Sequence, residues 1–146
     1  MKAKLEGHKE EILYIAYNPH NTNELASASK DGKIKIWDID RAEEIAELEG
    51  HTGAVRCVEF NPHKENVLIS SGDDHTIYIW DTVLKSRISS LEGHEGIVNH
   101  IAYNPFKKNE VLSSCEDGTL YVWDTESKTF SEMNLCKKKK KIFFFF

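Results

Sequence analysis

The sequence has few of the features that mark secreted, membrane-spanning or disulfide-bonded proteins. It has three cysteines among 146 residues, an odd number with no CxxC pair, which favours a reduced, intracellular protein. The N-terminal stretch MKAKLEGHKEE contains no apolar signal region, and no apolar run approaches the length of a membrane-spanning helix. These absences predict a cytoplasmic or nuclear protein with no membrane partner.

The chain also lacks the basic surface that nucleic-acid binding requires. Its formal net charge is −5, and five of its basic residues are the consecutive lysines 137–141. Without those five, 14 basic residues face 24 acidic ones, a balance of −10. An acidic body argues against binding to nucleic acid, which needs lysine and arginine clustered on one face. It suits a protein whose partners are other proteins or peptides.

The chain is rich, by contrast, in internal repetition. Five features recur three times with a period of 43 residues and no slippage. They are Gly-His at 7–8, 50–51 and 93–94, Asn-Pro at 18–19, 61–62 and 104–105, Trp-Asp at 37–38, 80–81 and 123–124, and single Ser and Asp residues. Such regularity predicts three copies of one structural unit rather than three unrelated hairpins.

Each unit has the pattern of four short strands. The segments ILYIAYNP, VRCVEFNP and VNHIAYNP predict strands that end in a proline turn. ELASAS, VLISSG and VLSSCE predict the second strands, and the alternating IKIWD, IYIWD and LYVWD predict the third. Weaker fourth strands are expected at 44–48, 87–91 and 129–133. We therefore expect antiparallel meanders and no helix.

Gly-His, a body of 28 residues and Trp-Asp together resemble the signature of the WD-repeat (WD40) family, over roughly residues 5–135. The resemblance implies an all-β fold, a partial β-propeller of three four-stranded antiparallel blades. The three repeats are expected at about 7–49, 50–92 and 93–135, within one domain at 1–135. Residues 136–146 form a low-complexity Lys/Phe tail, expected to be disordered.

The same resemblance implies that the recurring polar residues form a structural hydrogen-bonded network in each blade, because a buried Asp needs donors and a Trp N–H needs an acceptor. The expected networks are His8, Ser27, Asp31 and Trp37; His51, Ser70, Asp74 and Trp80; and His94, Ser113, Asp117 and Trp123. A hydrolase using one His/Ser/Asp set is the alternative, although catalysis needs such a set once rather than three times. No catalytic residue, metal or cofactor is expected.

If the network is the scaffold, partner-binding residues should lie where the repeats differ. In WD-repeat proteins, variable positions near the motif His and before the turn Asp commonly point to one end of the propeller, the top face. The expected partner-binding residues are Glu11, Leu13, Lys30, Ala54, Arg56, Asp73, Ile97, Asn99 and Glu116. Ordinary solvated loop residues are the alternative, and Arg56 and Asp73 belong to one repeat and are able to neutralise each other.

One turn breaks the repeat pattern. The second unit has His75 where the others have Gly32 and Gly118. Glycine tolerates a positive φ there and histidine does so less readily. Either this turn is strained or it uses ordinary dihedral angles.

Three blades are fewer than the four to eight of known propellers, and each terminal blade is expected to leave an apolar face bare. The chain is therefore interpreted as a fragment of a longer propeller, with a homodimer that completes the ring as the alternative. Lys2–Leu5 aligns with the outer strand at Ile45–Leu48. The tail resembles translated AT-rich noncoding sequence, with a basic localisation patch or membrane-surface anchor as the functional alternatives.

The predicted function is that of a WD-repeat protein-interaction scaffold without catalytic activity, which presents blade-edge loops to peptide or subunit partners in a larger complex. A nucleic-acid-associated subunit that binds through the basic tail is a further alternative. No small-molecule substrate is expected.

Overall fold

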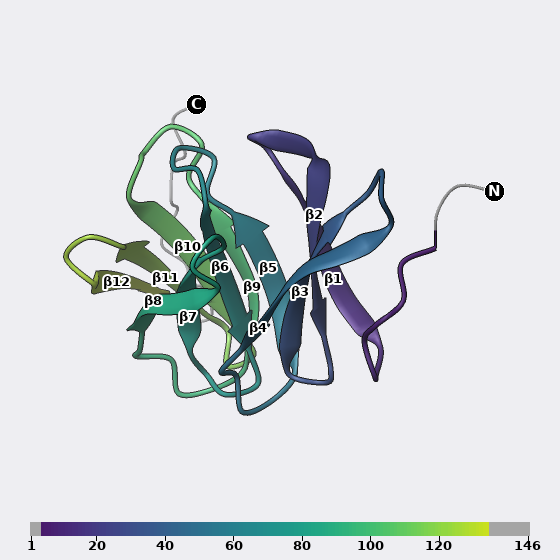
Figure 1. The fold of residues 1–146 in the computed structure, drawn as a ribbon. Coiled ribbons are helices and arrows are strands. Elements are labelled where there is room, and N and C mark those ends of the chain that lie inside the picture. Colours follow the sequence, from purple (N-terminus) through teal and green to yellow (C-terminus); the bar gives the residue numbers. More distant parts are fainter. Residues whose placement is uncertain (1–3, 135–146) are drawn as a thin grey trace.

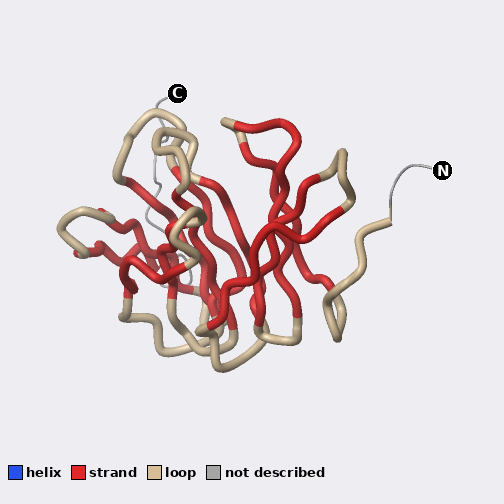
Figure 2. Tube along the Cα trace, in the orientation of Figure 1, coloured by secondary structure: helices blue, strands red, loops and turns tan. Residues whose placement is uncertain are grey.

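The computed structural model describes residues 4–134, which fold into three four-stranded antiparallel sheets. The predicted tail at 136–146 and the first residues of the expected Lys2–Leu5 strand lie outside this range. The sheets follow one another along the chain and stand side by side, from the purple and blue strands to the yellow-green ones (Figure 1). All regular elements of the described part are strands, and none is a helix (Figure 2). This confirms the all-β, partial β-propeller fold class.

Each sheet is a meander whose strands pair in chain order, and we call the sheets blades 1, 2 and 3. Blade 1 comprises β1 (Ile12–Asn18), β2 (Asn21–Ser29), β3 (Lys33–Asp38) and β4 (Glu43–Glu49). Blade 2 comprises β5 (Val55–Phe60), β6 (Val67–Gly72), β7 (Ile77–Asp81) and β8 (Ser86–Leu91). Blade 3 comprises β9 (Val98–Tyr103), β10 (Glu110–Cys115), β11 (Thr119–Asp124) and β12 (Thr129–Asn134).

The predicted strands agree closely with the observed ones because alternating apolar residues and turn signals mark most of their ends. The main difference is β2, which begins at Asn21 rather than at Glu24. Asn18 of β1 pairs with Asn21, so the hairpin continues almost to the Asn-Pro turn.

The core lies between blades. One cluster joins the small and aliphatic residues of β2, β3 and β4, such as Ala26, Ile34 and Leu48, to Val58 and Trp80 of blade 2. A second cluster joins blade 2 to blade 3 in the same way. The first strands of blades 2 and 3 pack on the blade before them: β5 contacts β1 and β2, and β9 contacts β5 and β6. Burial between sheets, not within one sheet, therefore holds the fold together.

The outer strand of blade 3 pairs differently from those of the other blades. The third and fourth strands of blades 1 and 2 have a register irregularity just before the Trp, at Ile36/Trp37 and Ile79/Trp80. β11 and β12 pair without one. β12 therefore lacks the extra, unpaired residue that β4 and β8 each have at this point, a difference that the constant period of the earlier motifs does not reveal.

Candidate functional site

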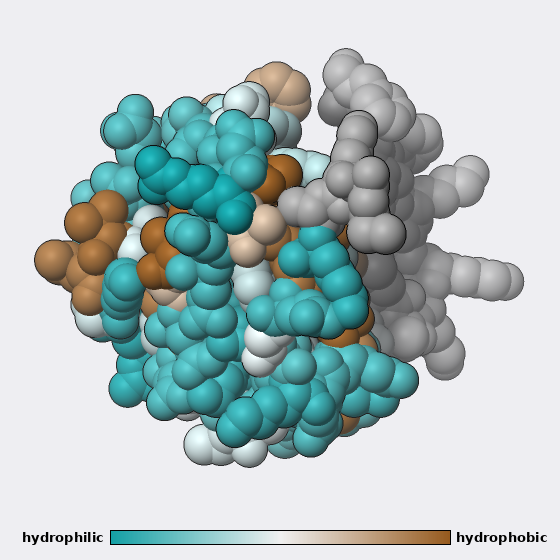
Figure 3. Space-filling model, turned by 45° about the vertical axis from the view of Figure 1, so that its right-hand side comes forward, coloured by the Kyte–Doolittle hydropathy of each residue, from teal (hydrophilic) through white to brown (hydrophobic). Residues whose placement is uncertain are grey.

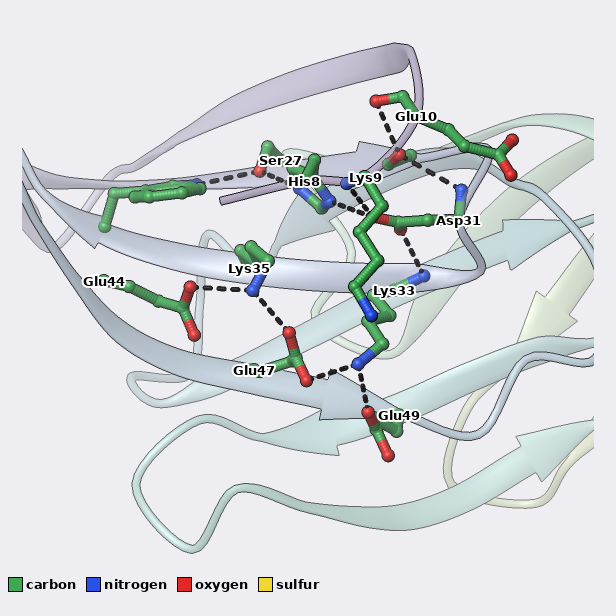
Figure 4. Close-up of polar contacts among 12 residues, drawn as sticks. His8, Lys9, Glu10, Ser27, Asp31, Lys33, Lys35, Glu44, Glu47 and Glu49 are labelled. Carbon is green, nitrogen blue, oxygen red and sulfur yellow. Dashed lines mark hydrogen bonds and ion pairs between the residues drawn. The ribbon is translucent and has the colours of Figure 1, made fainter. Parts of the chain in front are cut away.

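The motif residues of blade 1 meet at one end of the sheet. The His8 ring lies 2.9 Å from Asp31 through Nδ1 and 2.7 Å from Ser27 Oγ through Nε2. The indole Nε1 of Trp37 donates to the same Ser27 Oγ at 2.8 Å. The four side chains thus form one chain of contacts from β3 across β2 to the segment before β1 (Figure 4).

Blade 2 repeats this geometry. His51 Nδ1 lies 2.9 Å from the Asp74 carboxylate, and His51 Nε2 lies 2.7 Å from Ser70 Oγ. Trp80 Nε1 donates to Ser70 Oγ at 2.7 Å. Because a carboxylate only accepts, Nδ1 of each His donates to it, and in the neutral imidazole Nε2 accepts from the Ser hydroxyl. With neutral histidines, the direction of each hydrogen bond in these two networks is therefore determined.

The aspartates of these two networks are stabilised as anions. Burial acts to raise the pKa of Asp31, but hydrogen bonds from the Lys9 N–H, His8 and the Lys33 N–H outweigh it, and the pKa lies below its ordinary value. Burial likewise acts to raise the pKa of Asp74, and the hydrogen bond from His51 leads the contacts that lower it. Both carboxylates thus act as ionised acceptors for their histidine and for backbone N–H groups of their turn.

The Gly of each Gly-His pair lies closely against the Trp ring of its blade. A Cβ at Gly50 would lie 3.1 Å from the ring of Trp80, and one at Gly7 would lie 3.1 Å from the ring of Trp37. The recurrence of Gly, His and Trp together thus reflects one packing requirement.

In blade 3 the predicted network is incomplete, which corrects the expectation for Asp117. His94 Nε2 lies 2.6 Å from Ser113 Oγ, and Trp123 Nε1 donates to that oxygen at 2.7 Å. His94 Nδ1, however, is buried without a hydrogen-bond partner. The Asp117 carboxylate is exposed and accepts from the N–H and hydroxyl of Thr119 instead.

An aromatic stack accounts for this difference. The His94 ring lies almost parallel to Tyr121, with centroids 4.1 Å apart, and Phe130 stacks on the other side of Tyr121 at 4.4 Å. In blade 2 the equivalent His51 and Tyr78 rings are tilted by 49°, and Arg87 replaces the phenylalanine. The stack fixes the plane of the His94 ring, and burial lowers the pKa of His94.

The geometry weighs against the hydrolase interpretation. A nucleophilic Ser must reach its substrate, but Ser27, Ser70 and Ser113 are all buried. Each hydroxyl also receives a Trp N–H, which withdraws electron density from the oxygen. The three sets fit a structural role, in which the polar groups of neighbouring strands satisfy one another.

The predicted partner-binding residues lie at the same end of the blades as the networks. A backbone hydrogen bond of the same kind fixes each blade there: Lys30 N to Glu11 O, Asp73 N to Ala54 O, and Glu116 N to Ile97 O. The side chains held by this constant backbone differ from blade to blade. Glu11, Lys30, Asn99 and Glu116 are exposed, and Leu13, Ala54, Arg56, Asp73 and Ile97 are half-buried.

Several of these side chains pair with one another. Lys30 Nζ lies 2.5 Å from Glu11 and lowers the pKa of that carboxyl. Arg56 forms a two-point contact with Asp73, at 2.5 Å from Nε and 3.3 Å from Nη2, and its pKa is raised by Asp73. Blades 1 and 2 are thus largely neutralised at the top face.

The top of blade 3 is more acidic. Glu116 accepts a hydrogen bond from the Ile97 N–H at 3.2 Å and contributes to raising the pKa of Arg56 in the neighbouring blade. Glu95 and Asn99, which stand two residues before and after Ile97 in the sequence, are exposed. Between blades 1 and 2, Lys30, Gly32, His51 and Thr52 line an open pocket of about 190 Å³. The top residues of adjacent blades therefore form one continuous surface.

Two features of the structure were not anticipated. His20 donates from Nε2 to the carbonyl of Asn61 at 2.9 Å, and His63, 43 residues later, does the same to Asn104 at 3.1 Å. The 43-residue spacing of these histidines is a signal that would have indicated a contact between blades. The second is an ion cluster in blade 1, in which Lys33 and Lys35 contact Glu44, Glu47 and Glu49 (Figure 4).

Within residues 4–134, no three His, Cys, Asp or Glu side chains are grouped so as to hold a metal ion. Cys57 lies 3.1 Å from the ring of His100, but it is fully buried and burial raises its pKa to about 11. No helix in the described range is long and apolar enough to span a membrane.

Comparison with known proteins places these observations in a family. The model of the EIPR1 β-propeller family matches residues 8–123. Ribosome biogenesis protein YTM1 of Lodderomyces elongisporus is 44% identical over 39 residues, 27% of this chain and 8% of the relative. YTM1 of Candida albicans is 45% identical over 42 residues, 29% and 9% of the two chains. Coronin-2A of Bos taurus is 50% identical over 36 residues, 25% and 7%. The matched segment spans less than a tenth of each relative.

Proposed function

The chain belongs to the WD-repeat β-propeller family, and we propose that it acts as a protein-interaction scaffold whose top face binds a peptide segment or subunit of a partner. The observation that carries the proposal is the contrast at this face. The backbone hydrogen bond and the Ser–Trp and Ser–His contacts are the same in all three blades, whereas the nine side chains above them differ.

The charges of the top face favour a basic partner segment. Lys30 and Arg56 already have acidic partners, Glu11 and Asp73. Glu116 adds an acid whose carboxylate accepts a hydrogen bond from the backbone N–H of Ile97. An arginine or lysine of the partner would therefore find an acceptor at the boundary between blades 2 and 3. Rigid presentation of these groups reduces the entropy cost of binding.

The proposal also covers the cellular location of the protein. The partner is described only by its basic charge, because the fold alone does not identify it. The similarity to a ribosome biogenesis protein supports a nuclear location, and an intracellular one agrees with the cysteine usage.

The test is a display library of random peptides selected on the full chain, followed by Kd measurements by fluorescence anisotropy. Enriched peptides should carry Lys or Arg. Arg56→Glu and Glu116→Lys should each change their affinity by about tenfold or more, with unchanged circular dichroism. Lys64→Glu, an exposed charge next to the Asn61 turn at the other end of blade 2, is the matched control and should leave Kd within about twofold.

A library that yields only peptides indifferent to Arg56→Glu and Glu116→Lys would overturn the top-face proposal. Peptides lost equally on Lys64→Glu would do the same, because a general charge effect would then explain the binding.

A further inference from the structure

The outer strand of blade 2 has an open edge. β8 is the last strand of its sheet and pairs only with β7 among residues 4–134 (Figure 1). The equivalent strand of blade 1, β4, bears four glutamates, Glu43, Glu44, Glu47 and Glu49, whereas β8, with the sequence SRISSL, bears a single charge. Charged side chains protect a free strand edge against pairing with another chain, so β8 is the less protected of these two edges.

A hollow between blades 2 and 3 lies beside β8. Exposed apolar residues alone would not mark a site, because separate brown patches interrupt the hydrophilic surface in Figure 3. The exposed Ile88 of β8, however, lines a hollow of about 140 Å³ together with Val67 of β6, Ile79 of β7 and Tyr103 of β9. A cavity of roughly 150 Å³ with apolar walls takes up benzene. The hollow therefore has room for one leucine, isoleucine or valine side chain.

A departure from the repeat makes this hollow apolar. Blades 1 and 3 have Glu24 and Glu110 at the position of Val67, 43 residues before and after it. Their carboxylates accept hydrogen bonds from the side-chain amides of Asn18 and Asn104, at 2.8 and 2.7 Å. Val67 has no polar group and lines the hollow instead. Among the three described blades, blade 2 alone thus replaces a contact of the scaffold by an apolar surface.

The charge at this edge is positive. The guanidinium of Arg87 lies over the Tyr78 ring, 4.7 Å from its centroid. The preceding basic residue, Lys85, donates to the Ile45 carbonyl at 2.7 Å. Within residues 4–134 neither cation has a carboxylate partner, whereas Glu44, at the Arg87 position of blade 1, pairs with a lysine of its own blade. Stacking on the ring holds the guanidinium in place for a carboxylate supplied from outside.

We propose that β8 binds an extended segment of a partner protein, which adds a strand to blade 2 and has alternating aliphatic and acidic side chains. Successive side chains of a strand point to opposite faces of the sheet. The hollow opens on the face of blade 2 toward blade 3, whereas Tyr78, under Arg87, packs on the core cluster shared with blade 1. The aliphatic side chains would therefore enter the hollow and the acidic ones would meet Arg87. Main-chain hydrogen bonds give affinity in such strand additions, and the side-chain sites give specificity.

This surface differs from the top face in position and in charge. Asn61 and Thr125 also line the hollow, and they belong to turns at the opposite end of the blades from the His–Ser–Trp networks. The top face favours a basic segment, whereas Arg87 and Lys85 favour an acidic one. Two segments of different chemistry are therefore able to bind the chain at the same time.

The test measures Kd on the full chain by fluorescence anisotropy with synthetic peptides. The probe is Ser-Thr-Leu-Glu-Val-Asp-Thr-Ser, and a second peptide with Lys in place of Glu and Asp should bind about tenfold or more weakly. Two further versions are N-methylated on the main chain, one at Leu and Val and the other at Glu and Asp. Only one of these sets of N–H groups points to β8 in an added strand, so one version should lose binding and the other should keep it.

Matched variants separate the charge from the hollow. Arg87→Glu should weaken binding of the probe by about tenfold or more, and Lys128→Glu, the same change of charge at an exposed residue of blade 3, should leave Kd within about twofold. Ile88→Ser should weaken binding by about fivefold, and Ile45→Ser, the same change at the equivalent position of β4, should leave it within about twofold. All four side chains are exposed, so circular dichroism should be unchanged.

Val67→Gln tests the floor of the hollow. It gives blade 2 a polar side chain at this position, as blades 1 and 3 have. The probe should then lose its advantage over a peptide with Ser in place of Leu and Val, because the hollow no longer selects an aliphatic side chain.

Equal binding of the probe and of its Lys-containing counterpart would overturn the proposal. So would a Kd that Arg87→Glu and Ile88→Ser leave unchanged, or a probe that does not bind at about 1 mM. Loss of binding by both N-methylated peptides, or by neither, would refute strand addition. The peptides proposed for the top face are basic and depend on Arg56 and Glu116, which are not part of this site, so the two proposals fail separately.

Discussion

Adjacent serines on β6 give a sharp test of the network. Ser70 and Ser71 are both fully buried. Ser70 Oγ accepts from Trp80 Nε1 and donates to His51 Nε2, each over 2.7 Å. Ser71 Oγ has no hydrogen-bond partner. The same change, Ser to Ala, should therefore have opposite consequences at neighbouring positions.

Ser70→Ala removes one oxygen and leaves two buried polar groups unpaired, the indole N–H of Trp80 and Nε2 of His51. Each such loss costs about 1–3 kcal/mol, so the variant should lose about 2–6 kcal/mol of unfolding free energy. Domains of this size have about 5–15 kcal/mol in total, so the loss is a large fraction. Ser71→Ala removes an oxygen that is already unpaired and should be neutral or stabilising by up to about 1 kcal/mol. Blade 1 already has Ala28 at that position.

The assay is urea denaturation followed by tryptophan fluorescence, at one protein concentration because assembly would shift the midpoint. With a slope of about 2 kcal/mol/M, Ser70→Ala should lower the midpoint by about 1–3 M without changing the slope. A Ser70→Ala variant within about 0.5 kcal/mol of the wild type would refute the reasoning. So would a Ser71→Ala variant that is destabilised as much as Ser70→Ala.

Three further predictions concern single residues. Asp74→Asn should cost about 1–3 kcal/mol because His51 loses its carboxylate, while Asp117→Asn should change stability far less because Asp117 does not hydrogen-bond to His94; equal losses in urea denaturation would contradict this. Burial lowers the pKa of His94 below 6.5, so the folded state disfavours its protonation, and its contribution to stability is complete above pH 6.5 and is lost as pH falls through the folded-state value. The lowered pKa values of Asp31 and Asp74 add a second loss below about pH 4, and denaturation midpoints measured from pH 8 to 3 should show both steps. His75 has a φ of 64° where Gly32 and Gly118 have 79° and 84°, so His75→Gly should stabilise by up to about 1 kcal/mol, and a lower melting temperature would contradict the strain.

The strand positions followed from the sequence because each strand is marked locally, by alternation and by its turns. The side-chain networks of blades 1 and 2 were expected from the resemblance to the WD-repeat family, and the 43-residue period placed His51, Ser70 and Asp74 in the same roles as His8, Ser27 and Asp31. The positive φ at His75 was one of two open alternatives, and the structure has the strained one. Contacts between blades were not predicted, because the partner of His20 is a backbone carbonyl 41 residues away, and the 43-residue spacing of His20 and His63 is the only trace that the contact leaves in the motifs.

Blade 3 shows why a perfect motif does not guarantee a complete network. Its His, Ser, Asp and Trp stand in register with the other two repeats, yet Asp117 and His94 do not bond. The decisive residue is Phe130, on the strand that lacks the irregularity of blades 1 and 2. It stacks on Tyr121, and Tyr121 holds the His94 ring nearly parallel to itself, so the orientation of the imidazole is set by packing instead of by the carboxylate. The contacts common to all three blades are those from Ser to His and from Trp to Ser. The contact from Asp to His is therefore the one that a blade can lack. In blade 3 the Asp117 carboxylate is exposed, and its negative charge adds to that of Glu116 at the top face, where we propose that the basic partner binds.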